Sequence, residues 1–174
     1  MTRVYVRKAT EKDIPKICEI IDAGRGYLKE QGINQWQGAY PSPEDIKKDI
    51  DNSVSYVIDV DGAVAGSATL HLGLDPDYLD MKEGTWKNGV EAHYSAIHRV
   101  SVSHDYRGQG LSGKLISGLL TVSSLLGFKD VRIDTHPKNK GMQHVILSSG
   151  FEKRGVICTK VEDDDRFAYQ MEIN

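Results

Sequence analysis

The stretch SVSHDYRGQGLSGKLI, residues 101–116, carries the strongest local signal in the chain. An alternating apolar segment precedes it and a long apolar segment follows it, so we expect a strand, a turn and a helix. Within the turn, Arg107 stands before Gly108, Gly110 and Gly113. Glycines at a helix entrance leave backbone N–H groups free to approach an anion, and the helix N-terminus adds partial positive charge. The stretch therefore predicts a phosphate-binding turn.

The same glycines spell the G-x-G-x-x-G of dinucleotide-binding enzymes, and Asp134 lies about 20 residues further on, where a ribose-binding acid is expected. An NAD(P)-dependent enzyme is therefore one alternative. Against it, the residues HDYR separate the strand from the glycines, whereas the dinucleotide turn is tight. The chain also continues for too few β-α-β units to build a second nucleotide-binding half. A glycine-rich surface turn without a ligand is the other alternative.

The composition is that of one globular domain spanning residues 1–174. Hydrophobic residues make up 39% of the chain, charged residues 27%, and the formal net charge is -3. This charge argues against nucleic acid or an anionic membrane as the main partner. Cys18 and Cys158 lack CxxC neighbours, which indicates a reducing compartment and no metal site. Because the N-terminus has no apolar signal segment, we expect a cytoplasmic protein.

The pattern along the chain predicts alternating helices and strands. Strands are expected at 4–7, 53–60, 63–72, 96–103, 131–135, 156–162 and 167–173, and helices from Asp13, from Ser42, at 111–126 and at 138–150. Asp61-Gly62 predicts a tight hairpin turn. Residues 73–94 lack periodicity and are expected to form a long functional loop. The order indicates an α/β fold with a mixed sheet and helices on its faces.

Four blocks of the chain resemble the GNAT superfamily of N-acetyltransferases. VSHDYRGQGLSGKLI resembles the coenzyme A loop of that family, whose pattern is Gln/Arg-x-x-Gly-x-Gly/Ala. Arg107, Gly110 and Ser112 occupy the pattern positions, and Ser112 departs from the usual Gly or Ala. The opening YVRKATEKDIPKICEII, the segment HPKNKGMQHVILSSGFEKRGV and the final RFAYQMEI resemble further blocks of the family in the same order.

This resemblance implies a GNAT-like fold, a central mostly antiparallel sheet with helices on both faces. It implies direct transfer of the acetyl group of acetyl-CoA to a primary amine, on a small molecule or a peptide. The cofactor-binding residues that it implies are the backbone of Val100, Ser101 and Val102 for the pantetheine arm, the loop residues Arg107, Gly108, Gln109, Gly110, Leu111 and Ser112 for the pyrophosphate, and Asn139 on the next helix. Many relatives form dimers, so a homodimer stays open.

Acetyl transfer needs a base, because an aliphatic ammonium is not nucleophilic until it loses a proton. The candidates are His98 on the cofactor strand and Glu91 before it, with His93 and His136 as further histidines. Each could instead have a structural or surface role. The acceptor site that the family suggests would be lined by Trp36, Tyr40, Trp86 and His93. The acidic loop 73–94 would attract a cationic amine, or would simply be a solvated surface.

The leaving thiolate also needs a proton. Many relatives use a tyrosine four residues before the closing glycine of Gly-Phe, and here that position is Ile146. Tyr94 and Tyr106 are possible substitutes. The absent tyrosine leaves a second class of function open, a non-catalytic domain that binds or senses acyl-CoA.

Overall fold

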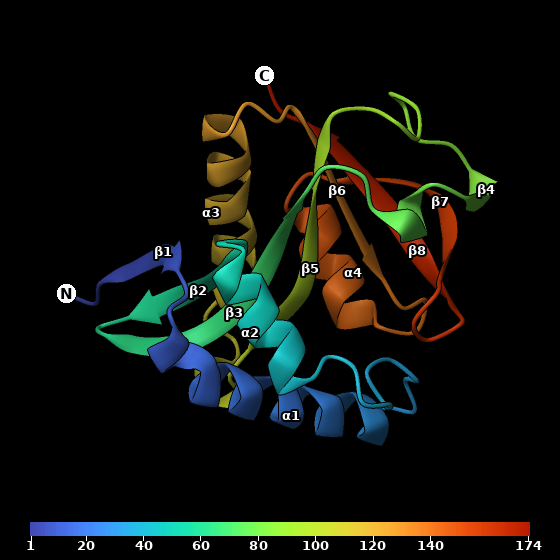
Figure 1. Cartoon of the computed structure of the whole chain (residues 1–174). Coiled ribbons are helices and arrows are strands. Elements are labelled where there is room, and N and C mark those ends of the chain that lie inside the picture. Colours follow the sequence, from blue (N-terminus) through green and yellow to red (C-terminus); the bar gives the residue numbers. More distant parts are fainter.

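The computed structural model describes residues 1–174, and its eight strands form one sheet (Figure 1). The strands are β1 (Val4–Lys8), β2 (Ser55–Val60), β3 (Ala63–Leu72), β4 (Met81–Gly84), β5 (Tyr94–Val102), β6 (Asp130–Thr135), β7 (Glu152–Thr159) and β8 (Asp164–Glu172). Their order in the sheet is β1-β2-β3-β5-β6-β8-β7-β4. Only β5 and β6 run parallel, which confirms the expected mostly antiparallel mixed sheet.

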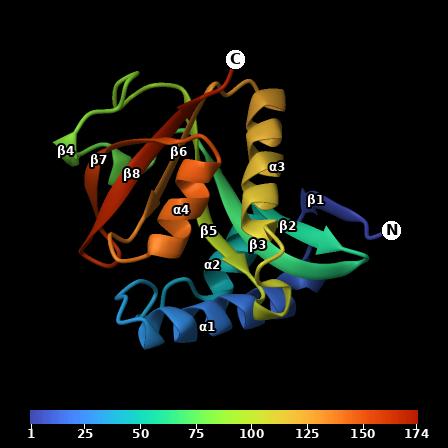
Figure 2. The same ribbon diagram turned by 180° about the vertical axis from the view of Figure 1, so that it is seen from behind.

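Helices cover both faces of the sheet, as expected. The helices are α1 (Ile14–Glu30), α2 (Pro43–Asp51), α3 (Leu111–Leu125) and α4 (Lys140–Ser148). Helices α1 and α2 lie on one face, and the view from behind shows α3 and α4 on the other (Figures 1 and 2). The core under α3 and α4 contains Leu115, Leu119 and Ile146, whereas α1 buries Ile17 and Ile21 against Val57 of β2.

The hairpin predicted at Asp61-Gly62 is confirmed. Val60 pairs with Ala63, so the loop contains two residues, and both have positive φ, 52° for Asp61 and 93° for Gly62. These are the dihedral signs of a type I′ turn, whose twist matches that of the flanking strands. The tight turn makes β2 and β3 antiparallel neighbours, although their register shifts between Ile58 and Asp59.

The expectation that residues 73–94 form a loop throughout is wrong for Met81–Gly84. These residues form strand β4, which pairs with β7 at the edge of the sheet. Before it, Pro76–Tyr78 form a 3-10 turn that buries Tyr78, and Trp86 lies buried beside Tyr78. The sequence of this strand, MKEG, has one apolar side chain and no alternation of apolar and polar residues. Strands β7 and β8 also begin earlier than expected, at Glu152 and Asp164.

Two further features bear on function. None of the helices combines the length and the apolar character needed to span a bilayer. No group of three or more His, Cys, Asp and Glu side chains is placed to hold a metal ion.

Helix α3 packs closely on β1, and we predict that Gly118→Ala destabilises the protein. A Cβ built on Gly118 would lie 2.5 Å from Cγ2 and 2.9 Å from Cβ of Val6. Overpacking of this kind costs about 1–3 kcal/mol, partly offset by the helix propensity that alanine gains over glycine. We expect a net loss of about 1–2 kcal/mol in thermal unfolding. Gly113→Ala in the same helix is the matched control, since a methyl group there would have no neighbour within 4 Å, and an equal loss in that variant would contradict the packing argument.

Candidate active site

The sheet opens at its centre, between β5 and β6. The last pair that joins these two strands is Ile97 with Ile133. Beyond it, β6 continues beside β8 as far as Thr135, while β5 continues beside β3 as far as Val102. The edge of β5 that faces β6 therefore has no partner strand after Ile97, and an unpaired strand edge offers N–H and C=O groups to a ligand.

A β-bulge in β5 adjoins this opening. Thr69 pairs with His98 and Ser67 with Ser101, so β5 has one more residue than β3 between these pairs. The bulge contains Arg99, whose φ of 55° is in the left-handed region that non-glycine residues seldom adopt. A bulge re-aims side chains, and here the consecutive residues His98 and Arg99 both contact groups on the face that α2 and the 73–93 segment cover.

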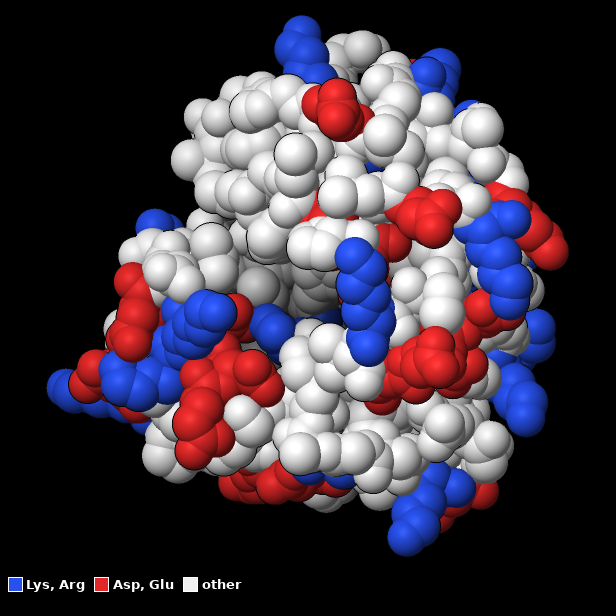
Figure 3. All heavy atoms as spheres, turned by 45° about the vertical axis from the view of Figure 1, so that its right-hand side comes forward, with Lys and Arg blue, Asp and Glu red and all other residues white.

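A cavity of about 1230 Å³ runs through the opening. One end is formed by the loop from Tyr106 to Gly113 and by the start of α4, and the other by the α1–α2 loop, α2 and the hairpin that joins β7 to β8. Figure 3 shows a hollow in the molecular surface with Asp and Glu side chains on both sides of it. The opening in the sheet therefore joins two ends of the cavity that are lined by different segments.

The loop before α3 offers a cluster of free backbone donors. Gly108 and Gly110 have φ of 76° and 68°, which a side chain would disfavour. The loop N–H groups with no acceptor in the protein are those of Gly108, Gly110, Leu111, Ser112 and Gly113. Arg107 lies over the ring of Tyr27, with its guanidinium carbon 4.2 Å from the ring centroid. This end of the cavity suits phosphate oxygens.

At the apex of the opening, His98 lies between two carboxylates. Its Nε2 is 2.7 Å from Oδ2 of Asp75, and its Nδ1 is 3.8 Å from Oδ2 of Asp134. The hydroxyl of the buried Tyr78 donates to the same oxygen of Asp134, at 2.8 Å. The backbone N–H of Asp75 donates to the hydroxyl of Tyr94, at 2.7 Å, which fixes the position of the acidic residue.

The two carboxylates determine the charge state of His98. Burial disfavours the imidazolium, but the hydrogen bond to Asp75 and the charges of Asp134 and Asp75 outweigh it, so the pKa of His98 is raised. Burial alone would raise the pKa of Asp75, yet the hydrogen bond and the charge of His98 lower it. Burial raises the pKa of Asp134. Because the Asp75 carboxylate can only accept, Nε2 of His98 carries a proton and Nδ1 is the basic nitrogen.

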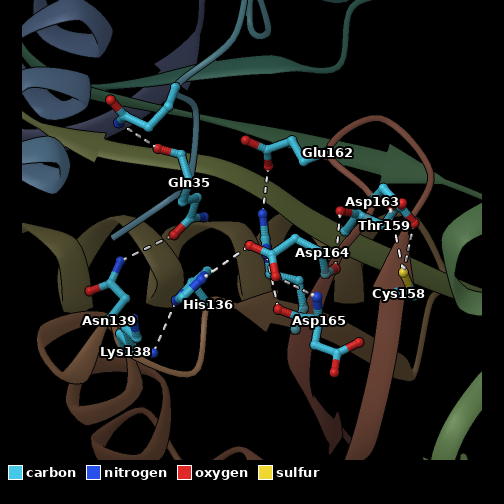
Figure 4. A network of polar contacts seen from close by, with 12 residues as sticks. Gln35, His136, Lys138, Asn139, Cys158, Thr159, Glu162, Asp163, Asp164 and Asp165 are labelled. Atoms are coloured by element: carbon cyan, nitrogen blue, oxygen red, sulfur yellow. Dashed lines mark hydrogen bonds and ion pairs between the residues drawn. The ribbon is translucent and has the colours of Figure 1, made fainter. Parts of the chain in front are cut away.

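Two further contacts join the α1–α2 loop to the opposite wall of the cavity. The backbone N–H of Trp36, whose φ is 62°, donates to Glu162 in the β7–β8 hairpin. Glu162 also accepts from Arg166 at 2.6 Å. The second contact is the hydrogen bond that Gln35 accepts from Asn139 at 3.4 Å, which Figure 4 shows together with the position of Glu162. The loop and the hairpin thus close one side of the cavity.

The sequence and the fold identify the family. A sequence model described as the Acetyltransferase (GNAT) family matches residues 25–151. The chain belongs to this family. A GNAT family acetyltransferase from Streptococcus agalactiae 2603 is 31% identical, with a TM-score of 0.90 over 98% of this chain and 96% of that one.

More distant members share the fold alone. N-acetylglutamate synthase from Neisseria gonorrhoeae, complexed with coenzyme A and N-acetyl-glutamate, is 18% identical with a TM-score of 0.69, over 99% of this chain and 35% of that one. Ribosomal-protein-alanine N-acetyltransferase from Brucella melitensis is 18% identical with a TM-score of 0.71, over 97% and 99% of the two chains. Membership of the GNAT family supports N-acetyltransferase activity.

The structure brings most of the sequence-predicted residues of this GNAT chain to the cavity. Those that line it are Trp36, Tyr40, His98, Val100, Ser101, Val102, Arg107, Gly108, Gly110, Leu111, Ser112 and Asn139. Trp86 instead lies buried away from it, where the indole N–H donates to the carbonyl of Tyr78. His93 stacks on Phe128, with the ring centroids 4.2 Å apart, and Glu91 and Gln109 are exposed outside the cavity. His136 is also outside the cavity lining, buried with its Nε2 3.2 Å from Oδ2 of Asp164, so the structure separates these five residues from the other candidates.

Neither of the tyrosines considered as proton donors, Tyr94 and Tyr106, takes the place of Ile146 in this GNAT chain. Ile146 is fully buried in the core under α3 and α4. Tyr94 is also fully buried, and its hydroxyl is occupied by the N–H of Asp75. Tyr106 lies at the end of the cavity formed by the loop before α3, which we call the phosphate end. Tyr40 lies beside Arg99 at the opposite end, formed by the α1–α2 loop, α2 and the β7–β8 hairpin, which we call the acceptor end. Burial raises the pKa of Tyr40 to about 12, which the charge of Arg99 only partly opposes.

Sequence reasoning missed the side chains that support His98. Asp75 appeared only as one acid of a charged loop, and Asp134 only as a ribose ligand under the dinucleotide interpretation. Asp75 and Asp134 come from segments far apart in the chain, and only the closing of the sheet brings them to one histidine. The Asp75-Pro76 pair does mark a turn, which was the available local signal.

We predict that His98 titrates above the ordinary histidine pKa of about 6.5, and that Asp75→Asn lowers this pKa by about one pH unit or more. Asparagine keeps a hydrogen-bond acceptor but removes the charge that stabilises the imidazolium. The measurement is an NMR titration of the imidazole resonances. Asp105→Asn, which changes a surface carboxylate beside the exposed His104, is the control. A His98 titration that is identical in Asp75→Asn and the parent protein would refute the coupling.

Proposed function

We propose that residues 1–174 form one N-acetyltransferase domain that transfers the acetyl group of acetyl-CoA to a primary amine. One observation carries this proposal. A free strand edge joins a cluster of backbone donors at one end to a histidine flanked by carboxylates at the other. Acetyl-CoA would supply an activated acetyl thioester at the point where these two halves meet.

The residues of the chain fit such a ligand. The backbone of Val100, Ser101 and Val102 offers the free edge of β5 to the amide groups of a pantetheine arm. The unpartnered N–H groups after Arg107 suit a pyrophosphate, and Ser112 adds a hydroxyl. Asn139 caps α4 by accepting from Met142 N–H at 3.1 Å, and its amide nitrogen faces Gln35 at the rim of the cavity.

His98 is the residue that we assign as the base. Neutral His98 accepts a proton from the acceptor ammonium at Nδ1, which leaves a neutral amine with a lone pair for attack on the acetyl carbonyl. The positive charge that His98 then carries is stabilised by Asp75 and Asp134. When the tetrahedral adduct collapses, the carbon–sulfur bond breaks and the nitrogen loses its second proton to solvent. The leaving thiolate takes up one proton from solvent, because the aliphatic side chain of Ile146 has none to donate.

The assignment of the loop before α3 as the coenzyme-binding loop is tested with two glycine variants, one at each end of α3. Gly110→Ala forces a side chain into the left-handed region, at about 1–2 kcal/mol, and we expect CoA to bind about 5- to 30-fold more weakly. Gly127→Ala introduces the same strain at φ 85° beyond the far end of the helix, and it should leave CoA affinity unchanged. Calorimetric titration measures both. Equal affinity of the two variants for CoA would contradict the assignment of the loop.

Turnover is tested by following CoA release from acetyl-CoA with a panel of amines, with His98→Gln as the variant. Because the base must be neutral, kcat/KM should rise with pH through the raised pKa of His98. We expect His98→Gln to lower kcat by about 10²- to 10⁴-fold and to abolish this limb of the profile. His104→Gln, an exposed histidine outside the cavity, is the control.

Two results would change the functional assignment. CoA binding without turnover of any amine would favour a non-catalytic domain that senses acyl-CoA, the function that Ile146 keeps open. A pH limb that survives in His98→Gln would show that another group is the base.

A further inference from the structure

Two arginines line the acceptor end of the cavity, and they differ in how far their hydrogen-bonding capacity is used. Arg166 is fully buried, and its guanidinium is occupied by Glu162, Asp164 and the carbonyl of Asp165. Arg99 differs, because both of its hydrogen bonds use Nη1, to Asp49 and to the hydroxyl of Thr69. Its Nε is buried and has no partner in the protein.

The conformation of Arg99 is energetically unfavourable in two respects, its backbone and its unpaired donor. Its backbone is held in the left-handed region by the bulge, and its guanidinium carbon lies 5.0 Å from the centroid of the Tyr40 ring. A buried N–H without an acceptor is unfavourable, and a left-handed arginine adds strain. A salt bridge that only joined α2 to β5 would need neither the left-handed backbone nor the unpaired N–H. Costs of this kind concentrate at ligand clamps, where a bound group supplies the missing partner.

The neighbourhood of Arg99 specifies both ends of a ligand. Arg99 directly follows His98, and its side chain lies near enough for its positive charge to oppose the rise in the pKa of His98. An amine at His98 and an anionic group at Arg99 would therefore belong to one short molecule. Planar guanidinium groups bind carboxylates preferentially, through paired N–H donors. Asp75 and Asp134 provide the negative charge on the amine side.

The closed side of the cavity restricts the size of the ligand. The contact of Trp36 N–H with Glu162 joins the α1–α2 loop to the β7–β8 hairpin, and the hydrogen bond from Asn139 to Gln35 joins the same loop to α4 (Figure 4). A polypeptide could not lie between the loop and the hairpin without breaking these contacts. The acceptor end thus suits a compact molecule.

We propose that the acceptor is a small amino acid or a similar amino-carboxylate, whose carboxylate binds Arg99 while its amine faces His98. This inference rests on the proposed acetyltransferase function for its chemistry, but it concerns binding and is separable from turnover. Arg99 is a specificity residue in this view, and Asp49 and Thr69 hold it in place.

The test compares amino acids with their matched decarboxylated amines and carboxamides. For the parent protein we expect kcat/KM, followed by CoA release, to favour the carboxylates by about 10- to 100-fold. In Arg99→Gln that preference should disappear, because KM rises for the carboxylates by a factor that the decarboxylated amines do not show. Arg99→Lys should restore part of the preference. Lys160→Gln, which removes a basic side chain at the rim, is the control and should keep the preference.

A second readout separates this inference from the proposed function. Calorimetric titration of the same compounds into the CoA-loaded protein measures binding without chemistry, and CoA affinity reports whether Arg99→Gln is folded. Binding of amino-carboxylates that needs Arg99, without acetylation, would support the inference and contradict the enzymatic function. Turnover that ignores the carboxylate, or that falls equally for all compounds in Arg99→Gln, would support the enzyme and overturn the inference.

Discussion

The divergence of β5 from β6 after Ile97 is the constraint on which the rest of the site depends. Each strand keeps a partner on its outer side, β3 for β5 and β8 for β6, so the sheet can open at its centre without exposing both edges of either strand. His98 and Asp134 are the first residues beyond the last shared pair. Their meeting at the apex is therefore a consequence of the point where the pairing stops.

The opening persists because both faces of the sheet are covered around it. Ile97 and Ile133 belong to the core beneath α3 and α4, which secures the closed part of the strands. On the β3 side, the bulge needs a close approach, since a Cβ on Gly66 would lie 2.7 Å from the carbonyl oxygen of Ser101. The strained backbone of Arg99 is thus held by packing on its neighbours, which is the usual origin of such strain at functional sites.

The sequence predicts the fold here better than it predicts the site. The alternating strands, the Asp61-Gly62 turn and the long helix after the glycines each have a local cause and could be inferred. Strand β4 could not, because its pairing with β7 depends on glycines at positions 84 and 155 that allow the backbones to approach. The free backbone donors at the phosphate end all come from one continuous segment, residues 108–113, so a local pattern could indicate them. The acceptor end joins side chains from the α1–α2 loop, α2, β5 and β6, and no local pattern contains them.

The segment that leads to β4 connects the edge of the sheet to His98. Asp75 and Tyr78, which contact His98 and Asp134, precede β4, and Trp86 follows it and donates to the carbonyl of Tyr78. Asp77 in the same segment accepts from the N–H of Lys160 in the β7–β8 hairpin. The proton affinity of the centre is therefore set partly by packing at the periphery. A substitution in β4 that displaced this segment would change the pKa of His98 while every residue that lines the cavity stays the same.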